Sequence, residues 1–235
     1  MNMTRKPGRP VDRNLQMRRR EEILDAAARL FAAHGYAGAD TQELADGLGI
    51  AKGTLFRYFP TKRELFISCI ERAMERLRAR VDAAALGSAD PLEKLRLAIR
   101  AYLRFFDESP EVVELMILER AELKDHKATY FDRRGRRRES EHGWRKVVAE
   151  LVATGRFRRL SPDRILRFVG DLLYGTIFSS HLSGRARSLS SQAREVFEFV
   201  RYALSVGPVG PTRASRPAGT GAGHVATADR RRRSR

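Results

Sequence analysis

The chain has 235 residues, of which 42% are hydrophobic, and it carries a formal net charge of +17 and one cysteine. This length suits one or two domains, and no apolar run approaches the roughly 18 to 20 residues of a membrane-spanning helix. A lone cysteine excludes an internal disulfide and a zinc site built from several cysteines. Because no apolar segment follows the basic N-terminus, we expect no secretory signal and place the protein in the cytoplasm. We also expect no bound metal and no cofactor.

Most of the positive charge lies at the two ends of the sequence. Residues 1–20 contain seven Lys or Arg against one Asp, and residues 207–235 contain seven Arg against one Asp. Both ends have little to bury, so we expect a disordered basic arm over 1–17 and a disordered Arg-rich tail over 207–235. Clustered Lys and Arg indicate a polyanionic partner such as nucleic acid, although acidic lipid or plain solubility would give the same pattern.

Between these ends, apolar residues recur at helical spacing with no alternating strand pattern, which predicts an all-α fold of about nine helices. The first helix is predicted over residues 18–34, with Ile23, Ala27 and Phe31 on one face. Gly35 should end it, since glycine readily adopts the left-handed conformation that closes a helix.

Two short helices follow the first. One begins at Asp40 or Thr41, which are good N-caps, and closes at Gly49; the next spans residues 51–59 and stops at Pro60. A helix, a tight turn and a second short helix form the helix-turn-helix pattern, whose second helix enters the major groove of DNA.

The rest of the chain predicts longer helices. Thr61 and Glu64 form a capping box that opens a fourth helix of about 20 residues. Further helices are expected at 91–106, 111–124, 144–155, 162–182 and, from a cap at Ser190 or Ser191, as far as residue 204. Residues 125–138 remain undecided, because an arginine-rich run breaks their apolar pattern.

Residues 39–66, ADTQELADGLGIAKGTLFRYFPTKRELF, resemble the signature of the tetracycline-repressor-like (TetR) family. With the first helix, this resemblance covers about a quarter of the chain. It implies a helix-turn-helix DNA-binding domain over 18–60 and a helical effector-binding and dimerisation domain over 61–206. The implied function is that of a homodimeric repressor that a small-molecule ligand releases from a palindromic operator.

The resemblance and the chemistry of the residues point to the same candidate DNA contacts. Lys52 can donate to guanine, Gly53 allows close approach of the backbone, and Tyr58 and Lys62 would reach phosphates. Phe56 stands where the family commonly has Tyr, so a contact there would be apolar. The candidate DNA-binding residues are Thr41, Lys52, Gly53, Thr54, Phe56, Arg57, Tyr58 and Lys62. Arg9 joins them, because Lys6-Pro7-Gly8-Arg9-Pro10 resembles an AT-hook core that enters the minor groove.

The family also builds a ligand pocket and a dimer interface from its later helices. Here an apolar or aromatic effector would fit among large apolar and hydroxyl-bearing side chains. The candidate pocket residues are Tyr102, Phe106, Met116, Trp144, Tyr174 and Phe178. The candidate dimer residues, on the last two helices, are Leu173, Ile177, Phe197, Val200 and Leu204. Glu119, Glu122 and His126 have a helical spacing that would suit a metal or cationic ligand, but we expect them to be solvated charges.

Two other classes of function are weighed against this one. An enzyme is disfavoured, because the sequence has no phosphate-binding glycine loop, no nucleophile elbow, no HExxH and no paired cysteines. A ligand-independent architectural DNA binder is favoured by the basic ends, and it would show little sequence preference. The sequence leaves the operator, the effector, the regulated genes and the sign of regulation undetermined.

Overall fold

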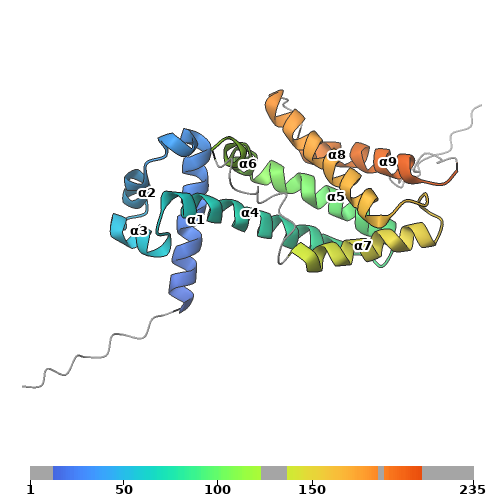
Figure 1. The fold of residues 1–235 in the computed structure, drawn as a ribbon, viewed down its shortest axis with the longest axis horizontal. Helices are drawn as coiled ribbons and strands as arrows, with labels where there is room; N and C mark the ends of the chain where they lie inside the picture. The colour runs from blue at the N-terminus through green and yellow to red at the C-terminus, as the bar shows by residue number, and fades with distance from the viewer. Residues whose placement is uncertain (1–12, 123–136, 185–187, 208–235) are drawn as a thin grey trace, which may run out of the picture.

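A computed structural model describes residues 13–122, 137–184 and 188–207 of the chain (Figure 1). Within these ranges it contains nine helices and, apart from one isolated bridge between Phe157 and Ser205, no strand. The predicted all-α fold is therefore confirmed. None of the helices in the described ranges is long and apolar enough to cross a membrane.

The helices are α1 (Arg13–Gly38), α2 (Thr41–Gly47), α3 (Lys52–Tyr58), α4 (Lys62–Ala85), α5 (Pro91–Glu108), α6 (Glu111–Glu122), α7 (Arg137–Ala153), α8 (Pro162–Leu182) and α9 (Leu189–Leu204). Most of the undecided segment 125–138, and the outer parts of both basic ends, lie outside the described residues.

Helices α1, α2 and α3 form a small group around one apolar cluster. Two glycines shape it: Gly35, at φ 71°, breaks α1 as predicted, and Gly49, at φ 63°, turns the chain between α2 and α3. Only a residue without a Cβ adopts this left-handed conformation at no steric cost. The side chains that hold the group together are Ile23, Leu24, Ala27, Phe31, Leu44, Ala45, Leu55 and Phe59, all buried.

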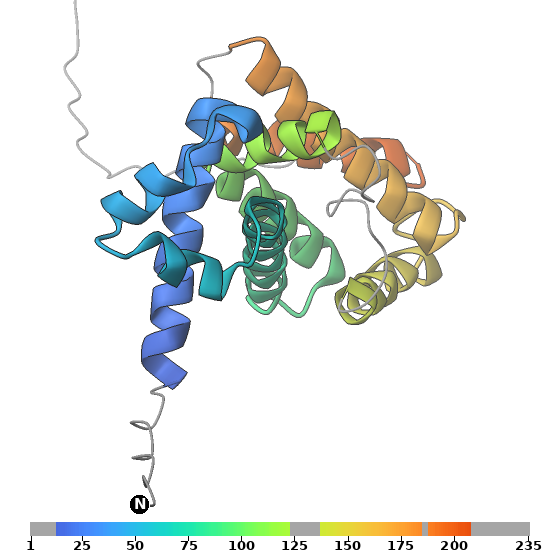
Figure 2. The same ribbon diagram turned by 60° about the vertical axis from the view of Figure 1, so that its left-hand side comes forward.

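The first helix starts earlier than expected, at Arg13 instead of residue 18, so residues 13–17 are helical rather than part of a disordered arm. The sequence from Asn14 to Met17 has no helix breaker, and extending an existing helix costs little. These first turns project beyond the other two short helices (Figures 1 and 2). Leu15 and Met17 are accordingly exposed, at 62% and 68%.

Helix α4 connects this group to the rest of the molecule (Figure 1). It begins as the capping box predicts, with the Thr61 hydroxyl accepting a hydrogen bond from the Glu64 amide at 3.0 Å. Helix α5 begins in the same way, because the Asp90 carboxylate accepts from the Glu93 amide at 3.0 Å. Both starts follow from local sequence alone.

The larger group of helices, which we call the body, is built around α5. Helix α5 contacts α4, α7, α8 and α9, while α6 lies against α1 (Figure 2). The apolar core runs without interruption from α1 to α9. Helices α4 and α6 therefore both join the short helices to the body.

The last helix begins at Leu189, with Ser188 as its N-cap, and not at Ser190 or Ser191. Its start is fixed by a residue distant in sequence, Asp107 at the end of α5. The Asp107 carboxylate accepts from the amides of Leu189 and Ser190 at 2.7 Å each. A cap from another helix leaves no local sequence signal, which explains the misplaced boundary.

Candidate nucleic-acid interface

Helix α3 presents a polar face of a kind that suits a DNA groove. Its one fully buried residue, Leu55, packs under the helix, while Lys52, Gly53 and Arg57 are exposed. Thr54 and Phe56 are half-buried at the edges of that face. The helix has no side-chain cap, because Ala51 occupies the N-cap position.

The turn before α3 is held by its own backbone. The Gly49 amide donates to the Asp46 carbonyl and the Ile50 amide to the Ala45 carbonyl, both at 3.0 Å. Thr41 is the first residue of α2 and is half-buried, with Asp40 capping the helix through a 2.7 Å bond to the Gln42 amide. These bonds fold the turn back onto α2, and α3 begins two residues after it.

Two of the expected phosphate contacts also have roles inside the protein. The Lys62 ammonium donates to the Ala37 carbonyl at 3.0 Å and lies 5.3 Å from the centre of the Tyr36 ring. Tyr58 is half-buried and packs against the apolar core. Arg9 lies outside the described residues.

Arg20 of α1 is a further basic residue beside α3, and it was not among the candidate DNA contacts. Its guanidinium lies 5.1 Å from the centre of the Phe59 ring, directly after α3, and the residue is exposed. Arg18 beside it is exposed as well. The run Arg18-Arg19-Arg20 at the predicted start of the first helix was the signal that would have found this basic surface next to α3.

The candidate pocket residues lie on four helices of the body, α5, α6, α7 and α8. Phe106 and Met116 are buried in the core, and Tyr102 packs on Phe106 with ring centres 5.3 Å apart. Tyr174 and Phe178 form a second pair at 4.2 Å, and burial raises the pKa of the Tyr174 hydroxyl. The Trp144 indole donates to the Asp82 carboxylate at 2.9 Å, which ties α7 to α4.

One cavity in the described part of the body lies between α5, α6, α8 and α9, and of these six residues Phe106 is among its walls. This cavity has a volume of about 370 Å³, and its walls are Phe106, Asp107, Pro110, Val113, Ile177, Ser180, His181, Gly184 and Leu189. His181 is held by Glu114, with 2.7 Å between its Nε2 and the carboxylate. The walls combine apolar side chains with the polar groups of Asp107, Ser180 and His181.

The candidate dimer residues are placed differently from the expectation. Leu173, Ile177, Phe197, Val200 and Leu204 are all less than 10% exposed and belong to the core of the single chain. Their own chain already encloses these five side chains, and their part in a dimer contact stays a prediction. The large apolar side chains that α8 and α9 leave exposed are Phe168, Leu182, Phe199 and Tyr202.

Glu119 is not the solvated charge that we expected, because it is only 1% exposed within α6. Helical periodicity places it on the same face as the buried Leu115 and Met116. Glu122 is exposed, as expected, and His126 lies outside the described residues.

Two family models match the chain, and together they cover more than half of it. Residues 23–69 match the model of bacterial regulatory proteins of the tetR family. Residues 88–177 match the model of the tetracyclin repressor-like C-terminal domain. The first match contains the whole of α2 and α3.

Individual proteins give the same picture. The HTH-type transcriptional repressor KstR of Mycolicibacterium smegmatis is 35% identical over 101 residues, which are 43% of this chain and 50% of that protein. The nucleoid occlusion factor SlmA of Vibrio vulnificus is 32% identical over 121 residues, 49% of this chain and 62% of that protein. The chain thus spans about half to three-fifths of the length of these relatives.

Among solved structures, the transcriptional regulator FadR from Bacillus subtilis in complex with stearoyl-CoA superposes with a TM-score of 0.62 over 77% of this chain and 96% of that one. The two are 18% identical in sequence, so this likeness concerns the fold.

Proposed function

Because the chain belongs to the tetR family of bacterial regulatory proteins, we propose that it is a homodimeric, sequence-specific DNA-binding transcriptional regulator. We further propose that it acts in the cytoplasm as a repressor, which a small apolar molecule releases from a palindromic operator. The observation that carries the proposal is helix α3, whose Leu55 is buried while Lys52, Gly53 and Arg57 are exposed on a rigid helix-turn-helix.

The proposal assigns α3 to the major groove and divides its contacts into two kinds. Lys52, at the first turn of α3, would donate to a guanine edge, which carries sequence information. Tyr58, Lys62 and Arg20 would meet phosphates, which fix the register of the protein on DNA but carry no sequence information. Arg57 on the same face, Thr54 and Phe56 at its edges and Thr41 at the start of α2 would complete the surface.

Dimerisation is part of the proposal, because a helix of seven residues reads few bases. The exposed side chains of α8 and α9 supply an apolar surface, with Phe199 at 63% and Tyr202 at 68% exposure. Two copies related by a twofold axis would bury the same surface residues on both chains. The dimer would then present two α3 helices to successive major grooves.

An effector is proposed for the 370 Å³ cavity of the body. Its walls offer apolar contacts from Phe106, Val113 and Ile177, and hydrogen-bonding groups at His181 and Ser180, so they suit a ligand with both apolar and polar groups. FadR, whose structure contains stearoyl-CoA, sets a precedent within this fold for a ligand that carries a long apolar chain. For a hundredfold loss of operator affinity, the ligand must prefer the form that does not bind DNA by about 2.7 kcal/mol, and operator DNA must weaken ligand binding equally.

Selection of bound duplexes from a random DNA library tests the main proposal with the full-length protein. We expect a palindrome whose half-sites are about 34 to 36 Å apart, together with a footprint over both. Mapping of bound sites across the genome would then identify the regulated genes. Enrichment of DNA without any common motif would contradict the proposal.

A second candidate function is that of a constitutive DNA binder without an effector. It is favoured by the basic ends of the sequence. A thermal-shift screen of apolar, aromatic and cationic compounds, with stearoyl-CoA included, separates the two. A stabilising compound that binds free protein and the protein–operator complex equally well would favour the constitutive binder.

A further inference from the structure

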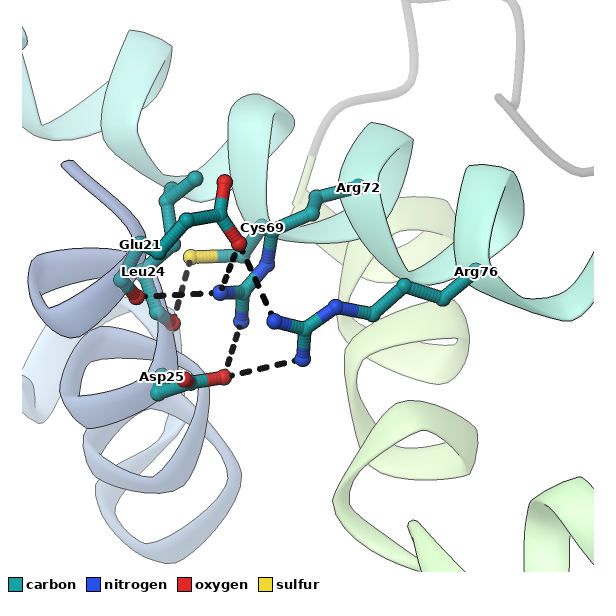
Figure 3. A network of polar contacts seen from close by, with 6 residues as sticks. All are labelled: Glu21, Leu24, Asp25, Cys69, Arg72 and Arg76. Carbon is teal, nitrogen blue, oxygen red and sulfur yellow. Dashed lines mark hydrogen bonds and ion pairs between the residues drawn. The ribbon is translucent and has the colours of Figure 1, made fainter. Parts of the chain in front are cut away.

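Two acidic residues of α1 face two arginines of α4 where these helices cross (Figure 3). Glu21 and Asp25 are one turn apart on α1, and Arg72 and Arg76 are one turn apart on α4. We call these four residues the α1–α4 joint. Its two negative and two positive charges neutralise one another, so the joint needs no further ion.

Each carboxylate of the joint is shared by both arginines. Oδ1 of Asp25 accepts from Arg72 at 2.7 Å and from Arg76 at 3.0 Å. Oε2 of Glu21 accepts from Arg72 at 3.2 Å and from Arg76 at 3.0 Å. Arg72 also donates to the Glu21 main-chain carbonyl at 3.0 Å, so the joint is bonded to the backbone of α1 as well as to its side chains.

The environment of Arg72 indicates a positional role. Its side chain is only 11% exposed, and its Nε is buried with no hydrogen-bond partner among the described residues. Burying an unpaired polar group has a free-energy cost, which an apolar side chain at this place would avoid. Apolar contacts such as those of Leu24 and Phe66 tolerate small changes of angle, whereas hydrogen bonds from a planar guanidinium are directional.

The joint lies on the path between α3 and the body. Helix α4 begins beside α3, crosses α1 at the joint, and continues along α5. A change of angle at the crossing would therefore swing α2 and α3 as a unit.

From this geometry we propose that Glu21, Asp25, Arg72 and Arg76 are positioning residues for DNA binding. They fix the tilt of the helix-turn-helix on the body and so set the distance between the two α3 helices of a dimer. This inference rests on the proposed function. None of the four residues needs to touch DNA.

The first test measures the tilt in free protein, with spin labels at Glu43→Cys on α2 and Arg194→Cys on α9, two exposed positions. The native Cys69 is buried and will not take a label. Labelled chains are diluted with an excess of unlabelled chains, so that distances within one chain are read. We expect Asp25→Asn and Arg76→Gln each to widen the distance distribution by about twofold, because the helix-turn-helix would then adopt several tilt angles instead of a single one.

The matched control is Arg78→Gln, which removes the same charge from the same helix. Arg78 donates to the Met74 carbonyl of its own helix at 3.1 Å and takes no part in the joint. It should leave the distribution narrow. The tests use Arg76, which is 48% exposed, because loss of the more deeply buried Arg72 is more disruptive to folding. The double variant Asp25→Asn/Arg76→Gln should be no wider than either single variant.

The second test uses the duplex selected by the wild type and the same duplex with one base pair inserted at its centre. The wild type should discriminate strongly between them, and Asp25→Asn and Arg76→Gln should each reduce that affinity ratio by about tenfold, with Arg78→Gln unchanged. Single-base changes within a half-site should be discriminated as before.

Three results would overturn the inference. One is that Asp25→Asn and Arg76→Gln give the same distance distribution and the same affinity ratio as the control Arg78→Gln. Another is an equal loss of affinity on every duplex together with a lower melting temperature, which is what a purely structural role would give. A wild type that selects no twofold-symmetric duplex would overturn the proposed function and this inference together, whereas failure of the joint variants alone leaves the proposed function intact.

Discussion

At the scale of single residues, Lys52 and Lys62 have the same charge and different surroundings. Lys52 is exposed at the start of α3, whereas Lys62 is half-buried and already donates to the Ala37 carbonyl. A side chain that is free to reach a base edge can discriminate between bases, while one held at the helix start offers its charge to the backbone of any duplex.

We therefore expect Lys52→Ala to relax preference at one base pair per half-site by about 1 to 3 kcal/mol. Lys62→Ala should weaken binding to all duplexes and reduce the slope of log affinity against log salt by about one. Titrations over matched and mismatched duplexes at several salt concentrations measure both effects. Arg63→Ala, an exposed neighbour on the same helix, is the control for loss of charge alone. Equal losses on matched and mismatched duplexes for both lysine variants would contradict this division.

Cys69 gives a prediction about reactivity. The residue is buried and its Sγ lies 3.6 Å from the Leu24 carbonyl. Burial raises the pKa of its thiol from 9.0 to about 12. The thiolate is the reactive form, so a disulfide reagent at pH 8 should leave the folded protein unmodified and react fully after unfolding in guanidinium.

The raised pKa of Cys69 also fixes the sign of its pH effect. The folded state holds this proton more tightly than the unfolded state. Its contribution to the free energy of unfolding is fully present below pH 9.0 and is lost as the pH rises toward about 12. Cys69→Ala should lack this alkaline loss when urea unfolding is measured from pH 8 upward. Rapid modification of the folded wild type would show that α1 and α4 separate readily.

At the scale of secondary-structure elements, α9 depends on Asp107 of α5 for its start. Besides the two amides, the Asp107 carboxylate accepts from the Ser188 hydroxyl at 2.6 Å and from the Ser190 hydroxyl. Burial raises the pKa of Asp107, but the bonds from Ser188, Ser190 and Leu189 outweigh it and hold the pKa below its ordinary value. Since α9 packs along α5, this one carboxylate joins two helices of the body.

Asp107→Ala should lower the free energy of unfolding by about 0.5 to 2 kcal/mol, the usual cost of losing an N-cap. Urea titrations measure the loss, with Asp171→Ala, an exposed acidic residue of α8, as the control. Because the folded pKa is lowered, the contribution of Asp107 is present above its unfolded pKa of 3.8 and disappears as the pH falls through the folded value. The variant and the wild type should therefore converge in stability at low pH. A difference that persists unchanged there would assign the effect to packing instead.

At the scale of the whole molecule, two phenylalanines of α9 have different roles: one packs in the core of the chain, and the other is exposed where a partner chain could bind. Phe197 is 5% exposed and belongs to the core, whereas Phe199 is 63% exposed, and Tyr202 is 68% exposed one turn further on. Exposed apolar side chains grouped on two helices are typical of a surface that a partner covers.

We expect Phe199→Glu/Tyr202→Glu to give a folded monomer that no longer binds the palindrome, because a buried unpaired charge opposes the dimer contact. Phe197→Glu should instead unfold the chain. Sedimentation velocity measures the oligomeric state, and circular dichroism measures the helix content. A wild type that sediments as a monomer at micromolar concentration, or a double variant that still dimerises, would rule out this surface.

The sequence by itself determined the features that depend on neighbouring residues. Helical periodicity predicted the all-α fold, Gly35 and Gly49 marked the turns, and Thr61 and Asp90 marked the starts of α4 and α5. Each of these signals acts over one or two helical turns, so no tertiary contact was needed to read it. The family resemblance over residues 39–66 pointed to the helix-turn-helix for the same reason.

Only the tertiary structure decided which apolar faces the single chain covers and which charges meet across helices. Leu173 and Phe197 looked available for a partner, yet the fold encloses them and leaves Phe199 exposed. Periodicity identifies an apolar face but not what covers it. Asp107 meets the start of α9, and Asp25 meets Arg72, across more than 40 residues of sequence. Such contacts arise because folding brings distant helices together, and no local pattern records them.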